Sequence, residues 1–110
     1  MVTDKVLIND IIESIKIISH YLKDCSLEDL QNDLMRQDAI IRRFEIIGEA
    51  ASKVSDPLKK KYNAIDWRDM KSMRNFLIHD YKNVTIKLIF ETSKTILPAQ
   101  LEKLKEIEII

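Results

Sequence analysis

Turn-forming residues are almost missing from this chain, and their scarcity constrains its fold more than any other feature. One glycine and two prolines occur in 110 residues. Sheet-rich folds of this length need many more such residues, because tight turns depend on glycine and proline. The sequence therefore predicts an all-α protein, and its 33% charged and 45% hydrophobic residues suit a helical bundle.

The length and the cysteine content limit the classes of protein further. A chain of 110 residues can bury a core but has no room for a separate cofactor domain, so we expect a single helical domain over residues 1–110 and no cofactor. Cys25 is the only cysteine, which excludes an internal disulfide and a multi-cysteine metal site. No apolar run reaches 18 residues, so we expect no membrane span and a cytoplasmic location.

Apolar residues recur at intervals of three and four along most of the chain, as on one face of a helix. This periodicity predicts an up-down bundle of four to five antiparallel helices. Pro98 lacks a backbone N–H, so a kink is expected in the last helix. Ser26 resembles the N-cap of a short helix, and Asp56 resembles a cap placed before Pro57. The expected helices cover residues 7–23, a short turn after 26, 34–54, 57–62, 66–81 and 85–107.

The helix expected over 34–54 carries a polar row of Asp38, Arg42, Glu45 and Glu49. Ion pairs within the helix are one explanation for such a row, since its members are three or four residues apart. Gly48 falls in the middle of the same helix, where glycine costs up to about 1 kcal/mol relative to alanine. We therefore expect another backbone to approach closely at Gly48.

Arg74 occupies a core-facing position of the helix expected from Asp66, in a stripe with Trp67, Met70, Leu77 and Tyr81. A buried guanidinium without a partner costs several kcal/mol, so something must meet this charge.

Two partners for Arg74 remain open. One is a structural ion pair with Glu45 or Glu49, and the other is an anionic ligand in a cleft or subunit interface. His79 stacks over Asn75, four residues earlier, and lies about 140° around the helix from Arg74. Its imidazole, with an ordinary pKa of about 6.5, could transfer protons near neutral pH.

Charge is unevenly distributed, although lysine plus arginine and aspartate plus glutamate both number 18. Residues 59–87 hold eight basic and three acidic residues, a net charge of +5, whereas residues 1–58 carry −4. This segment could hold phosphate or could be an ordinary solvated helix face.

The segment RNFLIHDY begins with Arg74 and Asn75. After three further residues it contains His79, and after one more it ends with Tyr81. It resembles the signature of HepT-like toxins of the HEPN superfamily. The similarity also covers QDAIIRRFEIIGEAA and IDWRDMKSMRNFLIHDY, which look like the second and fourth helices of that family. Asp80 stands where many relatives have glycine, which leaves the turn after His79 less defined.

The resemblance implies a metal-independent RNA endonuclease toxin of a type II-like or type VII toxin–antitoxin pair. Arg74 and His79 would be catalytic, with Asn75 in support and no metal. The family is typically a symmetric homodimer with its motif in the intersubunit cleft. A cognate nucleotidyltransferase antitoxin would neutralise the toxin by adenylylating Tyr81.

Two other functions remain open. The motif could belong to a non-catalytic nucleotide-binding or docking subunit of a nucleotidyltransferase complex, or the chain could be a purely structural dimeric bundle. If the protein cleaves RNA in the presence of EDTA, and if this cleavage depends on the motif, the protein is an enzyme and neither of these two alternatives holds.

Overall fold

The computed structural model describes residues 3–79 and 85–108, and throughout this part of the chain the only regular secondary structure is helical. The all-α prediction is therefore confirmed. The elements are α1 (Asp4–Tyr21), α2 (Leu27–Gln31), α3 (Leu34–Lys53), α4 (Asp56–Lys61), α5 (Trp67–His79), α6 (Ile86–Glu91), the π-helical segment Thr92–Ile96 and α7 (Leu97–Lys105).

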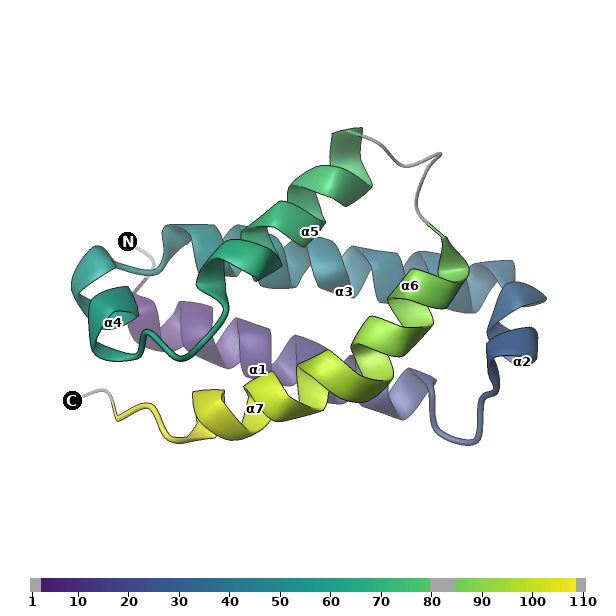
Figure 1. The fold of residues 1–110 in the computed structure, drawn as a ribbon, viewed down its shortest axis with the longest axis horizontal. Helices are drawn as coiled ribbons and strands as arrows, with labels where there is room; N and C mark the ends of the chain where they lie inside the picture. Colours follow the sequence, from purple (N-terminus) through teal and green to yellow (C-terminus); the bar gives the residue numbers. More distant parts are fainter. Residues whose placement is uncertain (1–2, 80–84, 109–110) are drawn as a thin grey trace.

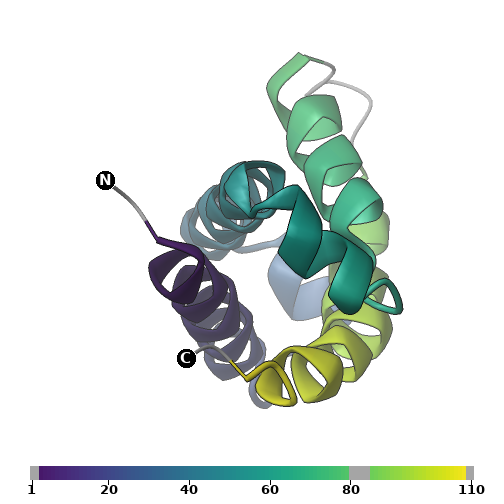
Figure 2. The same cartoon turned by 90° about the vertical axis from the view of Figure 1, so that its left-hand side faces the viewer.

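The long helices alternate in direction, as expected for an up-down bundle (Figure 1). Helix α3 packs against both α1 and α5, and α7 completes the bundle against α1. The end-on view in Figure 2 shows α1, α3, α5 and α7 arranged around one interior. The short helices α2 and α4 lie at opposite ends of the bundle (Figure 1).

Both apolar stripes that the sequence predicted for α1 and α3 face this interior. Burial of such side chains drives the assembly, at roughly 25 cal/mol for each Å² of apolar surface removed from water. The stripes consist of Ile8, Ile11, Ile15 and Ile18 of α1 with its C-cap Leu22, and of Ile40, Phe44, Ile47 and Ala51 of α3 with its C-cap Val54, all of them buried.

Side-chain caps fix the beginnings of several helices. Ser26 is the N-cap of α2, as the sequence predicted, and the structure adds a reciprocal capping box in which the Asp29 carboxylate accepts from the N–H of Ser26. At α4 the cap is Ser55, one residue before the predicted Asp56, because the hydroxyl of Ser55 accepts from the N–H of Leu58. Ser55 also donates from its N–H and its hydroxyl to the Asp4 carboxylate, at 2.9 and 2.6 Å, which joins the start of α1 to the start of α4.

The last helix changes direction between α6 and α7 (Figure 1), and a π-helical turn over Thr92–Ile96 precedes Pro98. The N–H of Leu97 donates to the carbonyl of Thr92, five residues earlier. The hydroxyls of Ser93 and Thr95 donate, each at 2.7 Å, to carbonyls four residues earlier in the helix. These bonds belong to the irregular stretch of helix that leads into Pro98, which itself has no backbone N–H to donate.

Among the described helices, none is long and apolar enough to cross a membrane. Within the same residues, no group of three or more histidine, cysteine, aspartate or glutamate side chains could hold a metal ion.

Candidate active site

Helix α5 places Arg74 at the edge of the core. Trp67, Met70 and Leu77 on the same stripe are 7%, 7% and 2% exposed, whereas Arg74 is half-buried. The indole N–H of Trp67 donates to the carbonyl of Tyr62 at 3.1 Å, which fixes the start of α5. Arg74 is therefore only partly covered, in contrast to the apolar members of the stripe.

Gly48 allows the close packing of Arg74. A β-carbon added at Gly48 would lie 2.1 Å from the β-carbon of Arg74 and 2.7 Å from the carbonyl oxygen of Met70. Real β-carbons essentially never come this close to other heavy atoms. The prediction that a second backbone approaches at Gly48 is confirmed by the carbonyl of Met70, and the first side-chain carbons of Arg74 pack at the same point.

The guanidinium of Arg74 has a partner on its own helix. Its Nη1 donates to the side-chain oxygen of Asn75 at 3.0 Å. The sequence placed Asn75 one turn before His79 on the same face of the helix, in support of the catalytic residues. In the structure its oxygen accepts one N–H of the five-donor guanidinium fork.

The carboxylates proposed as partners of Arg74 form ion pairs within α3. Glu45 pairs with Arg42 at 3.3 Å and Glu49 with Lys53 at 3.2 Å, which agrees with the intrahelical explanation. The hydrogen bond and charge of Lys53 lower the pKa of Glu49, and the charge of Arg74 makes a smaller contribution in the same direction. Glu49 is therefore within electrostatic reach of Arg74.

His79 is the last residue of α5. The His79 side chain, together with Asp80 and Tyr81, lies outside the described residues. Helix α5 thus contains three of the residues of the motif, Arg74, Asn75 and His79.

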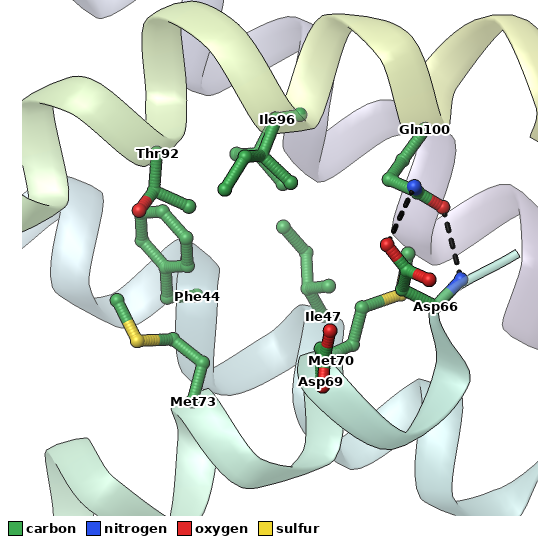
Figure 3. Close-up of a pocket in the computed structure, with 10 residues that line it drawn as sticks. Phe44, Ile47, Asp66, Asp69, Met70, Met73, Thr92, Ile96 and Gln100 are labelled. Carbon is green, nitrogen blue, oxygen red and sulfur yellow. Dashed lines mark hydrogen bonds between the residues drawn. The ribbon is translucent and has the colours of Figure 1, made fainter.

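A groove opens on the other side of α5, between that helix, α3 and the α6–α7 helix (Figure 3). Its volume is about 280 Å³, and its walls are mainly apolar. The lining residues include Phe44, Ile47, Met70, Met73, Ile96 and the carboxylates Asp66 and Asp69.

Gln100 at one end of this groove is a residue that the sequence reasoning missed. It is 4% exposed. Its side-chain oxygen accepts from the N–H of Asp66 at 3.0 Å, and its side-chain nitrogen donates to the Asp66 carboxylate at 2.9 Å (Figure 3). The only sequence signal was a polar residue in the apolar pattern of α7. The pair fixes the entry into α5, and so the rotation of the helix that bears Arg74.

The fold is a helical bundle with a half-buried arginine on α5. The chain belongs to the HepT-like ribonuclease family, whose model, Ribonuclease HepT-like, matches residues 11–107. The resemblance stated from the motif is thereby confirmed.

Two relatives illustrate the range of lengths in which this domain occurs. The chain is 35% identical over 102 residues to a protein named probable ribonuclease HepT from Thermococcus cleftensis, with 90% of this chain and 93% of that protein covered. It is 41% identical over 102 residues to a Methanocaldococcus jannaschii protein whose name gives a gamma-glutamylcyclotransferase and, provisionally, an RNase. That alignment covers 93% of this chain, but only 44% of the length of the Methanocaldococcus jannaschii protein. No solved structure matches the chain.

Proposed function

We propose that the protein is a metal-independent endoribonuclease in which Arg74 and His79 act on the scissile phosphate. The observation that carries this proposal is that Arg74 is half-buried at the edge of the core. Gly48 allows its stem to pack closely and Asn75 holds its head. Ribonuclease names among the relatives support the same reaction class.

The reaction needs a base, an acid and a cation. One imidazole removes the proton from a ribose 2′-OH, whose oxygen attacks the adjacent phosphorus. The bond from phosphorus to the 5′-oxygen breaks, and an imidazolium protonates that oxygen. The products are a 2′,3′-cyclic phosphate and a 5′-hydroxyl end. Arg74 stabilises the charge that develops on the phosphoryl oxygens, with its fixed fork of N–H donors.

A second copy of the chain supplies the second proton-transfer group in this proposal. His79 is the only histidine of the motif, and the other histidine, His20, lies in the last turn of α1. A two-fold dimer that brings two α5 helices together repeats each Arg74 and His79 in one cleft by symmetry. Light scattering at micromolar concentration should give twice the mass of 12.9 kDa. A monomer under these conditions would contradict the dimer.

Regulation is proposed to act at Tyr81. A nucleotidyltransferase antitoxin would attach AMP to its hydroxyl, two residues after His79, and the new phosphate would compete with RNA for Arg74. The protein would then be the toxin of a toxin–antitoxin pair. After co-expression with a neighbouring nucleotidyltransferase, intact-mass measurement should show an added AMP that the Tyr81→Phe variant lacks. An unmodified wild-type chain would refute this regulation.

The catalytic assignment is tested on purified protein with RNA in EDTA. Arg74→Ala should lower the cleavage rate by about 10²–10³-fold and His79→Ala by about 10²–10⁴-fold, with unchanged helical circular dichroism. Arg36→Ala and His20→Ala are matched controls that remove the same side chains elsewhere. Absence of cleavage by the wild type, with motif-dependent binding of AMP, would instead favour a nucleotide-binding subunit.

A further inference from the structure

Charged side chains are separated on the two sides of α5. Asp66 and Asp69 line the groove beside the α6–α7 helix (Figure 3). Arg68 and Lys71 are exposed and belong to the opposite side, because each residue turns an α-helix by about 100°. One side of the helix is therefore cationic, although the whole chain has no net charge.

The cationic side of α5 leads to the candidate active site. Lys71 precedes Arg74 and Asn75 by three and four residues, so it lies one turn before both of them on the helix surface. Arg68 lies one turn before Lys71. Successive turns are about 5.4 Å apart along the axis, so Arg68, Lys71 and Arg74 provide three positive charges spread over about two turns.

Within the basic segment 59–87, Arg68 and Lys71 are the residues that share helix α5 with Arg74. Lys59 donates to the carbonyl of Ser52 near the end of α3, and Lys61 lies 5.5 Å from the centre of the Tyr62 ring. In the described ranges 3–79 and 85–108, the ion pairs within 4.0 Å involve other cations than Arg68 and Lys71.

We propose that Arg68 and Lys71 form a phosphate-binding track on α5 that holds the backbone of single-stranded RNA next to the phosphate bound by Arg74. The proposal rests on the proposed ribonuclease function, because it names the substrate class and the direction in which the strand leaves the site. The two side chains bind phosphates and take no part in bond making or breaking. They determine affinity for a strand of several nucleotides, without reading its sequence.

The track predicts a specific salt dependence. Each phosphate neutralised on a single strand contributes about −0.7 to the slope of log affinity against log salt concentration. Losing two contacts should make that slope shallower by about 1.4. Between 50 and 200 mM salt, the affinity of an Arg68→Gln/Lys71→Gln variant should then fall about 7-fold less than that of the wild type.

The probe is a fluorescent 12-nucleotide 2′-O-methyl RNA, which cannot be cleaved by its own 2′-oxygen, with anisotropy as the readout. The matched control is Lys16→Gln/Lys23→Gln, which removes two exposed positive charges near α1 and its C-terminal turn. The control should keep the wild-type slope. An equal slope in both double variants, or no binding of this RNA by the wild type, would overturn the track.

A second readout separates this proposal from the catalytic one. Cleavage of a dinucleotide, which is too short to reach Lys71 and Arg68, should proceed at the same rate in the track variant and the wild type. Cleavage of a 12-nucleotide RNA by the track variant should show a raised KM and an unchanged kcat. If the wild type binds the probe through the track but cleaves neither RNA, the catalytic proposal fails and the track stands.

Discussion

The close contact between α3 and α5 at Gly48 makes Gly48→Ala the most informative single substitution in the bundle. The new β-carbon would lie 2.1 Å from the β-carbon of Arg74, and ordinary contact begins at 3.4 Å. The two atoms must therefore separate by about 1.3 Å, and the first carbon of a side chain can move only with its backbone. The carbonyl oxygen of Met70, at 2.7 Å, blocks a simple rotation.

Two effects of opposite sign determine the change in stability. Alanine in a helix interior is favoured over glycine by about 0.8–1.0 kcal/mol. Overpacking of a close contact costs about 1–3 kcal/mol, and here the upper half of that range applies because backbone atoms are among those that clash. We expect a net loss of about 1–2 kcal/mol in the free energy of unfolding, or about 4–8 °C in Tm for each kcal/mol.

Urea unfolding followed by circular dichroism measures this free energy, and RNA cleavage is measured at a temperature where the variant is folded. Cleavage should fall further than the folded fraction does, because the displaced helix carries Arg74. Ser52→Ala, one turn later on α3, is the control and should change stability by less than about 0.5 kcal/mol. A Gly48→Ala protein as stable as the wild type, or more stable, would refute the close-contact argument.

Three further predictions concern polar interactions. Asp4→Ala should lower the free energy of unfolding by about 1.5–3 kcal/mol, since its carboxylate accepts two hydrogen bonds at the start of α4; urea unfolding checks this. Gln100→Ala should cost about 1–3 kcal/mol, because it leaves the Asp66 N–H without its bond, and an unchanged urea midpoint would contradict it. The backbone N–H and the hydroxyl of Ser26 lower the pKa of Asp29, so its stabilising contribution is complete above the ordinary aspartate value and is lost as pH falls through the lowered pKa. NMR titration of the Asp29 carboxyl should show this depression, and Ser26→Ala should remove only the smaller part that the hydroxyl contributes, because alanine keeps the backbone N–H at position 26.

Periodicity and capping residues were sufficient to predict the helices, because each of these signals acts within one or two turns of chain. The close contact at Gly48 was also predictable from a local signal. Glycine destabilises a helix interior relative to alanine, so its presence there indicated that a close approach of another backbone compensates for the loss. Gln100 and Asp66 are 34 residues apart, and no local pattern links them. The predicted cap of α4 was Asp56, and the observed cap is Ser55. The sequence could not decide between these neighbours because serine and aspartate both cap helices well.

The candidate site was predictable as a set of residues but not as an arrangement. The stripe indicated that Arg74 faces the core and that it needs a partner. The stripe could not show whether the partner of Arg74 is Glu45 or Glu49 on α3 or Asn75 on its own helix. The choice of partner depends on how closely α3 and α5 approach each other. The dimer, the catalytic role of His79 and the modification of Tyr81 stay predictions.

The π-helical segment Thr92–Ile96 has a consequence for relatives of different length. A π turn holds one residue more than an α turn, so removing one residue here would restore a regular helix and leave both ends facing as before. Ile89 and Leu104, which are buried on either side of the segment, would keep their contacts. Sequence alignments of this family should therefore place a one-residue gap within 92–96, where the loss of one residue leaves the interior of the bundle intact.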